Sequence, residues 1–164
     1  SVSVIIPTYN EEESILKTLV SSVLQQQYEN HYEMEEIIIV DDGSTDNTAE
    51  IVEEYSYSAE KESRVKVKVI RNEKNSGMSS AMNKGLKHAL SGADGDIIDY
   101  IVFLDSDDVH MSPDWLEKLI EAMEEDNADV VVGSRQVVND DNKQYSSATR
   151  LINMEGGYNW SMMY

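Results

Sequence analysis

The chain has 164 residues and a formal net charge of -19, because 13 Lys and Arg stand against 32 Asp and Glu. A charge of this size repels nucleic-acid backbones and anionic membrane surfaces, so nonspecific binding to polyanions is excluded. With 40% hydrophobic residues and no cysteine, the chain can bury the core of one domain but can form neither disulfides nor thiolate metal sites.

The charge and the apolar residues are unevenly distributed along the chain. Residues 61–100 form the only basic region, with eight basic against five acidic residues. The longest aliphatic stretch is Ile37 to Val40, far below the roughly 18 residues of a membrane span. No basic, apolar leader precedes the first strand-like segment. We therefore expect a soluble, cytoplasmic chain without a membrane span, which a longer parent could hold at the cytoplasmic face of a membrane.

Short β-branched runs alternate with longer stretches of helical periodicity, a pattern typical of strands joined by crossover helices in a mostly parallel sheet. The runs that predict strands are 2–6, 36–40, 65–70, 100–104 and 130–133. In the third run, Lys66 and Lys68 alternate with valines, which predicts a strand with one solvent-facing side near the edge of the sheet.

Helical periodicity covers residues 11–27, 49–58 and 78–90, and a further helix begins at Ser112 and Pro113. Asn10 and Glu13 predict a capping box at the start of the first helix. Gly85 lies inside the third helix at a cost of about 1 kcal/mol relative to alanine, which indicates close packing there. Beyond Arg135 the sequence is polar and weakly periodic, and we assign no element to it.

The residues that follow the strands come first in a search for a site, because ligands of open parallel sheets bind beyond the carboxyl ends of the strands. Three of these loops are polar or acidic, namely Pro7-Thr8-Tyr9-Asn10, Asp41-Asp42-Gly43-Ser44 and Asp105-Ser106-Asp107-Asp108. The first helix opens with three glutamates, Glu11 to Glu13, which would repel the phosphates of a dinucleotide. A Rossmann dinucleotide site is therefore excluded, and no P-loop sequence is present.

The triad Asp105, Asp107 and Asp108 could gather carboxylate oxygens around one hard cation such as Mg²⁺ or Mn²⁺. Mutual repulsion of the carboxylates favours a bound cation or a raised pKa. A cation would also let so acidic a chain bind an anionic diphosphate, because the metal bridges carboxylates and phosphates. The alternative interpretation is a solvated loop that caps the following helix.

The second loop offers an acceptor, and the first loop offers a ring. Asp41 and Asp42 follow four aliphatic residues, so at least one carboxylate lies at the end of the sheet, where it could accept the imide N–H of a base. The alternative for these two residues is a turn with an Asx cap. Tyr9 could stack on a base, or it could simply belong to the core or the rim.

Four segments in order, VSVIIPTYNEEE, EIIIVDDGSTDNT, RNEKNSGMSSAMNKG and VFLDSDDVHMSPDWL, resemble the nucleotide-sugar-binding half of a family 2 glycosyltransferase with the GT-A fold. The resemblance spans residues 2 to about 135. It implies a Rossmann-like α/β fold, with a mostly parallel central sheet and helices on both faces. It also implies a metal-dependent, inverting transferase that moves a sugar from a nucleotide diphosphate, most often UDP, to an acceptor hydroxyl of a saccharide, lipid or protein.

The resemblance also implies roles for individual residues. Those that it assigns to the nucleotide are Pro7, Thr8, Tyr9, Asp42, Asn75, Gly77, Asp105 and Asp107. Tyr9 would stack on the base, Asp42 would accept the imide hydrogen, and the loop of Asn75 and Gly77 would close the donor pocket. Asp107 or Asp108 would be the direct ligand of Mn²⁺ or Mg²⁺. Family members often carry Arg where this chain has Met82, so a basic contact to the diphosphate is not expected from that position.

The end of the chain departs from the family pattern. Family members usually continue further and supply acceptor contacts and a catalytic Asp or Glu base. Asp140, Asp141 and Glu155 form no recognisable base motif, so no general base is identified. We expect a donor-binding core at residues 1–135 and an incomplete acceptor-side segment at 136–164.

Two alternatives to an active glycosyltransferase stay open. The first is a truncated or engineered GT-A core that binds nucleotide and metal without turnover. The second is a nucleotidyltransferase of similar architecture, although such enzymes usually carry a Gly-rich, basic loop after the first strand, which this chain lacks.

Overall fold

The computed structural model describes residues 1–20, 32, 34–62, 65–91, 98–107, 114–133, 136–138, 144–146 and 150–152. The chain divides into two compact units, Ser1–Pro113 and Asp114–Tyr164. Each unit is described by itself. None of the helices in the described ranges is long and apolar enough to cross a membrane.

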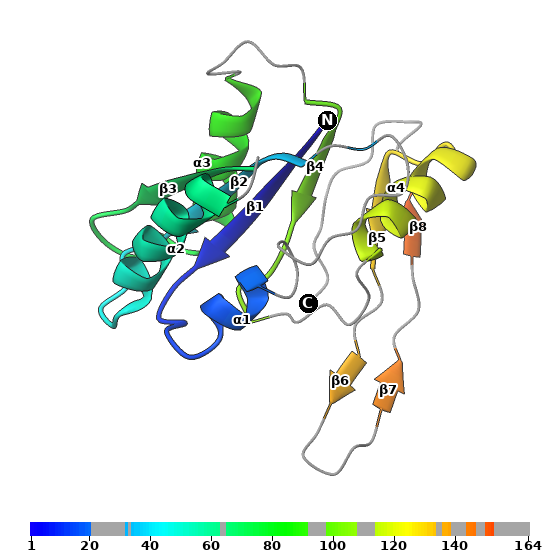
Figure 1. Ribbon diagram of the computed structural model, residues 1–164. Helices are drawn as coiled ribbons and strands as arrows, with labels where there is room; N and C mark the ends of the chain where they lie inside the picture. Colours follow the sequence, from blue (N-terminus) through cyan, green and yellow to red (C-terminus); the bar gives the residue numbers. More distant parts are fainter. Residues whose placement is uncertain are drawn as a thin grey trace. The chain divides into compact units, whose positions relative to one another are not determined.

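The first unit contains a four-stranded parallel sheet with the order β3-β2-β1-β4 (Figure 1). Its strands are β1 (Val2–Thr8), β2 (Met34–Asp41), β3 (Lys66–Arg71) and β4 (Tyr100–Phe103). The parallel sheet predicted from the alternating pattern is confirmed. The edge position predicted for the third strand is also confirmed, with Lys66 and Lys68 exposed and Val67 buried between them.

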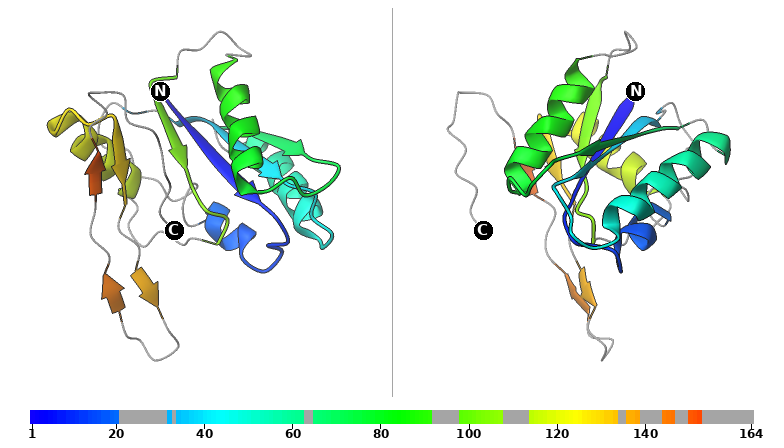
Figure 2. Two further views of the ribbon diagram at one scale, coloured as in Figure 1. Left: turned by 180° about the vertical axis from the view of Figure 1, so that it is seen from behind. Right: turned by 90° about the vertical axis from the view of Figure 1, so that its left-hand side faces the viewer.

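Helices cover both faces of this sheet (Figure 2). α3 (Met78–Leu90) packs against β1 and β2, while α2 (Thr48–Glu62) packs on the opposite side against β3 and β2 and contacts α1 (Ile15–Leu19). α3 has the bounds that its periodicity predicts. The first helix begins at Ile15, later than the predicted start at Glu11, because residues 12–14 form a turn. Residues 21–27 of its predicted range lie outside the described residues.

The predicted capping box at the first helix is wrong. α1 begins after Ser14 and has no side-chain hydrogen bond at its N-cap. Asn10 has φ 55, a left-handed conformation that asparagine tolerates. Its Oδ1 accepts the backbone N–H of Thr45 at 2.8 Å instead of a helix N–H. A contact with a distant loop has therefore replaced the local cap.

Under α3 the core consists of branched side chains on the sheet and small residues on the helix. Ile5, Ile38 and Val40 meet Ala81 and Ala89, and all five are buried. A Cβ added to Gly85 would lie 2.5 Å from Ile5 Cγ2 and 3.3 Å from Val40 Cγ2. The close packing predicted at Gly85 is confirmed, since α3 can approach the sheet this closely only without a side chain there.

The second unit contains one described helix and two small antiparallel pairs of strands. α4 (Trp115–Glu125) packs against β5 (Val130–Val132), which pairs with β8 (Arg150–Ile152). β6 (Gln136–Val138) pairs with β7 (Gln144–Ser146). The sequence assigned no element beyond Arg135, and the three strands there correct that assignment. Each has only three residues, too few to show an alternating pattern.

Gly85→Ala should lower the free energy of unfolding by about 1–3 kcal/mol, because overpacking against Ile5 outweighs the gain of up to about 1 kcal/mol in helix propensity. Urea unfolding measures this difference. Ile5→Ala removes the clashing Cγ2, so in the Gly85→Ala background it should cost less than in the wild type. Strictly additive effects of the two substitutions would show that the contact with Ile5 is not the cause.

Candidate functional site

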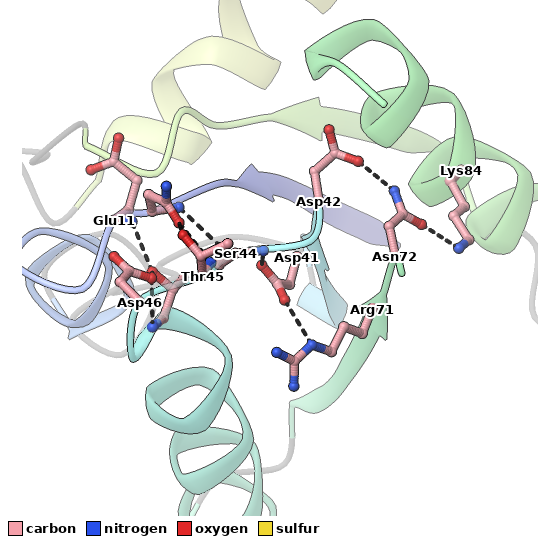
Figure 3. Close-up of polar contacts among 11 residues, drawn as sticks. Glu11, Asp41, Asp42, Ser44, Thr45, Asp46, Arg71, Asn72 and Lys84 are labelled. Carbon is pink, nitrogen blue, oxygen red and sulfur yellow. Dashed lines mark hydrogen bonds and ion pairs between the residues drawn. The ribbon is translucent and has the colours of Figure 1, made fainter. Parts of the chain in front are cut away.

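The loops that follow β1 and β2 are joined by hydrogen bonds between side chains and backbone. Asn10 N donates to Ser44 Oγ at 3.0 Å, and Thr45 N donates to Asn10 Oδ1 at 2.8 Å. One residue further along, Glu11 N donates to Thr48 Oγ1 at 2.8 Å. These contacts fix the two loops side by side at the carboxyl edge of the sheet (Figure 3).

Asp46 completes this connection at the start of α2. Its Oδ1 accepts the N–H of Thr48 at 3.0 Å and the hydroxyl of Thr48 at 2.6 Å, and its Oδ2 accepts the N–H of Glu12 at 3.3 Å. Burial by itself would raise the pKa of Asp46, but the hydrogen bonds from Thr48 and Glu12 outweigh it and hold the pKa below its ordinary value. Asp46 therefore stays ionised two residues before the start of α2, where it accepts the first backbone N–H of the helix.

Asp41, the last residue of β2, is fully buried, and its side chain stabilises the turn that follows the strand. Its Oδ1 accepts the N–H of Ser44 at 3.1 Å. Its Oδ2 forms an ion pair with Arg71 Nε at 3.3 Å, across the register that places Asp41 opposite Arg71. The turn that the sequence offered as an alternative is therefore formed, and Asp41 is the residue that closes it.

The neighbouring Asp42 is turned toward the loop between β3 and α3. Only 3% of its surface is exposed. Oδ1 accepts Asn72 Nδ2 at 2.5 Å and Ser76 Oγ at 2.7 Å, while Oδ2 accepts Ser76 N at 3.0 Å and Gly77 N at 2.7 Å. These donors fill the roughly four acceptor positions of a carboxylate. Burial by itself would raise the pKa of Asp42, but these hydrogen bonds outweigh it and lower the pKa below 3.8.

Gly43 allows the loop of residues 72–77 to lie directly on the turn after β2. Its φ is +77, and an added Cβ would lie 2.6 Å from the carbonyl carbon of Lys74 and 2.8 Å from the N of Asn75. Both neighbours are backbone atoms, which cannot move aside as a flexible side chain would. A glycine is needed here both for its conformation and for the space that it leaves.

The acidic turn after β4 begins beside the middle of β1, since Leu104 N donates to Ile5 O at 3.0 Å. The buried hydroxyl of Thr18 holds this turn from α1 by donating to Ser106 O at 2.8 Å. Asp105 is half-buried and Asp107 is exposed. Asp108 lies outside the described residues.

The described part of the chain contains no group of three His, Asp or Glu side chains placed to hold a metal ion. Mg²⁺ nevertheless commonly binds through one or two carboxylates, completing its shell with water and substrate phosphates. Asp105 and Asp107 supply hard oxygen donors of this kind on one turn. The donor set that the structure describes therefore fits Mg²⁺ or Mn²⁺ bound together with a diphosphate.

The structure brings some of the predicted nucleotide residues together. Gly77 N donates to both Asp42 Oδ2 and Asn75 Oδ1, so these three residues form one cluster. Pro7 and Thr8 are buried residues of β1, whereas Tyr9 just beyond them is 42% exposed. Of these three residues, only Tyr9 has a side chain exposed to a ligand. The roles assigned to all of these residues stay predictions.

Sequence reasoning assigned no role to three further residues around Asp42, namely Asn72, Ser76 and Lys84, although all three lie in the segment RNEKNSGMSSAMNKG. Asn72 contacts Asp42 directly, and Lys84 Nζ donates to Asn72 Oδ1 (Figure 3). Asn72 could have been found from the sequence, because it is a polar residue directly after β3, in the same position as the candidates after the other strands. Lys84 gave no such signal, since its spacing is that of an ordinary helix surface.

Replacing Gly43 tests the contact between the two loops. Gly43→Ala should lower the free energy of unfolding by at least about 2 kcal/mol, because it adds both a left-handed alanine and a clash with backbone. Gly43→Asn is the matched variant, since asparagine tolerates the left-handed conformation but still carries the clashing Cβ. Both variants should be destabilised in urea unfolding. Recovery of wild-type stability by Gly43→Asn would show that conformational strain, not the loop contact, is the cause.

The lowered pKa of Asp42 predicts a pH dependence of stability. A carboxyl whose pKa is lower in the folded than in the unfolded state stabilises the fold above its unfolded pKa, and this contribution is lost as the pH falls through the folded pKa. Asp42→Asn should therefore cost about 1–3 kcal/mol at neutral pH, with the deficit shrinking below about pH 4. Urea unfolding of both proteins across this range measures the deficit. A deficit that does not change with pH would contradict the ionised role of Asp42.

Comparisons with known proteins agree with this geometry. The family model described as Glycosyl transferase family 2 matches residues 3–163. The dolichol-phosphate mannosyltransferase of Pyrococcus furiosus is 43% identical over 136 residues, which are 83% of this chain and 33% of that protein. The chain spans between 16% and 51% of the length of the first eight curated relatives that it matches.

Two solved structures share the fold. S. aureus TarS 1-349 in complex with UDP is 32% identical with a TM-score of 0.60, and the match covers 80% of this chain and 34% of that chain. The mannosyltransferase PcManGT from Pyrobaculum calidifontis, in complex with GDP-Man and Mn²⁺, is 23% identical with a TM-score of 0.67. The match covers 85% of this chain and 36% of that chain. Because the family model spans nearly the whole sequence, the chain belongs to glycosyl transferase family 2, as its four sequence segments predicted.

Proposed function

We propose that this chain is the donor-binding part of a glycosyltransferase, which transfers a sugar from a nucleotide diphosphate, with UDP the expected nucleotide, to an acceptor hydroxyl. The observation that carries this proposal is the buried carboxylate of Asp42. It lies at the carboxyl edge of a parallel sheet and is kept ionised by hydrogen bonds from the next loop. The structure of TarS in complex with UDP, which is 32% identical, supports a nucleotide as the ligand.

The base is recognised by Tyr9 and Asp42. The exposed ring of Tyr9 provides a flat apolar surface on which a base stacks. Asp42 accepts the imide N–H of the base. Because its acceptor positions are already filled, the base N–H takes the place of one existing donor.

The turn after β4 binds the ribose and the diphosphate. Asp105 and Asp107 contact the ribose, and Asp107 or Asp108 holds Mn²⁺ or Mg²⁺. When bound, the cation neutralises the diphosphate and stabilises it as a leaving group. Thr18 holds the backbone of this turn in place through Ser106 O, which orients the carboxylates on either side of Ser106.

Transfer in a single displacement inverts the anomeric carbon and requires a base that deprotonates the acceptor hydroxyl. Asp140, Asp141 and Glu155 lie outside the described residues, so the structure assigns none of them to that role. The acceptor is a saccharide, lipid or protein hydroxyl. The alternative of a truncated or engineered core, which binds nucleotide and metal without turnover, would have all the contacts described above.

Calorimetry with UDP, with and without Mn²⁺, tests the proposal. We expect binding that depends on the metal and that Asp107→Asn or Asp108→Asn weakens by more than about tenfold, because each removes a charged oxygen donor. The control is Glu53→Gln, an exposed position of α2, which should leave the affinity unchanged. Wild-type affinity in both aspartate variants would refute the metal role.

A second measurement separates the transferase from the binding-only core. Release of sugar from a UDP-sugar, compared with the background of Mn²⁺ alone, reports turnover directly. Binding of UDP without release above that background favours the core that does not turn over.

A further inference from the structure

A chain of hydrogen bonds runs from α3 to the carboxylate at the edge of the sheet. Lys84 Nζ donates to Asn72 Oδ1, and Asn72 Nδ2 donates to Asp42 Oδ1 (Figure 3). Asn72 lies one residue past β3, and its own backbone N–H donates to Asp41 O at 2.8 Å. The three side chains therefore connect α3, the end of β3 and the end of β2.

The direction of these hydrogen bonds follows from the chemistry of Lys84 and Asp42, the first and last residues that they connect. An ammonium group can only donate hydrogen bonds, and an ionised carboxylate can only accept them. An amide between the two must therefore turn its oxygen to Lys84 and its nitrogen to Asp42. Lys84 thus fixes the orientation of the Asn72 amide, and through it one donor on Asp42.

The four donors to Asp42 differ in how easily they can leave. Two are the backbone N–H groups of Ser76 and Gly77, and their loop lies against Gly43 without spare room. The third is Asn72, which Lys84 holds from the far side. The fourth is the hydroxyl of Ser76, an exposed side chain that leaves by rotating about a single bond, although its oxygen also accepts Asn72 Nδ2 at 3.2 Å. One acceptor position on Asp42 is thus exchangeable, and three are held.

We propose that Lys84 and Asn72 are positioning residues for nucleobase recognition, because they hold Asp42 so that only the position occupied by the Ser76 hydroxyl is open to a base N–H. This inference rests on the proposed function, in which Asp42 accepts that N–H. A purely structural role for Lys84 and Asn72 would have a different consequence. Substituting either residue would then weaken the binding of all nucleotides equally, whether or not the base carries an N–H to donate.

Two ligands separate these consequences. UDP carries the imide N–H, whereas N3-methyl-UDP carries a methyl group in its place and has the same ribose and diphosphate. Calorimetry in the presence of Mn²⁺ gives the ratio of the two dissociation constants for each protein. In the wild type we expect UDP to bind at least about tenfold more tightly, because the methyl group of the other ligand cannot donate to Asp42 and also occupies the space through which an N–H reaches Oδ1.

Each variant removes hydrogen bonds made by one of the two positioning residues. Lys84→Met keeps the apolar stem without the donor, and Asn72→Leu removes the amide contacts with Asp42, Ser76 and Lys84. Each should reduce the preference for UDP by at least about threefold while leaving the affinity for N3-methyl-UDP unchanged. Lys84→Arg restores a charged donor and should restore the preference. Lys87→Met, an exposed lysine of the same helix, is the matched control and should behave as the wild type.

Ser76→Ala tests the exchange itself. Without the hydroxyl, Oδ1 of Asp42 has one vacant acceptor position, so UDP should bind more tightly and N3-methyl-UDP should be unaffected. This variant also keeps the test informative if Asn72→Leu unfolds, which thermal unfolding followed by circular dichroism would show. Weaker binding of UDP by Ser76→Ala would overturn the exchange.

The outcomes distinguish this inference from the proposed function. A wild-type chain that does not bind UDP overturns the proposed function and this inference with it. A wild type that prefers UDP, together with folded Lys84→Met and Asn72→Leu variants that keep the full preference, overturns only the inference. If these variants bind UDP and N3-methyl-UDP more weakly by the same factor, the inference is also overturned, because that result indicates a purely structural role.

Discussion

The organisation of the carboxyl edge of the sheet depends on one buried charge, the carboxylate of Asp42. A carboxylate removed from water is tolerated only when hydrogen-bond donors replace its hydration. The donors come from residues 72–77, which follow a different strand, so the charge ties the loop before α3 to the turn before α2. That arrangement in turn requires glycine at position 43, because any Cβ there would overlap the loop that supplies the donors.

In the proposed function, this arrangement also explains how a chain of net charge -19 presents an edge for an anionic ligand. The basic middle region, residues 61–100, supplies compensating charge where the acidic residues are buried. Arg71 pairs with Asp41, and Lys84 acts on Asp42 through Asn72. Two negative charges at the edge are thus already neutralised or fully hydrogen-bonded within the protein. Asp107 is exposed, and in the proposed function its carboxylate interacts with a cation rather than with these residues.

The sequence predicted most of the features that depend on local pattern. Short β-branched runs predicted the four parallel strands, the periodicity of residues 78–90 predicted α3, and Gly85 indicated close packing, which the structure shows to be against Ile5. Features that depend on contacts between distant residues were not predictable in this way. Asn10 favoured a local cap by its residue type, yet a loop 35 residues away competed for the same oxygen. Lys84 acquires its role only because α3 carries it to Asn72.

Recognition of a base by a carboxylate that is already saturated has an energetic consequence. The base N–H replaces the Ser76 hydroxyl, so the net gain is the difference between two hydrogen bonds, which is smaller than the about 1 kcal/mol of a typical single bond. In the proposed function, affinity must then come mainly from stacking on Tyr9 and from the diphosphate with its cation. Asp42 contributes selectivity instead. A base that cannot donate leaves the Ser76 hydroxyl in place and must fit beside it, whereas a donating base can displace it.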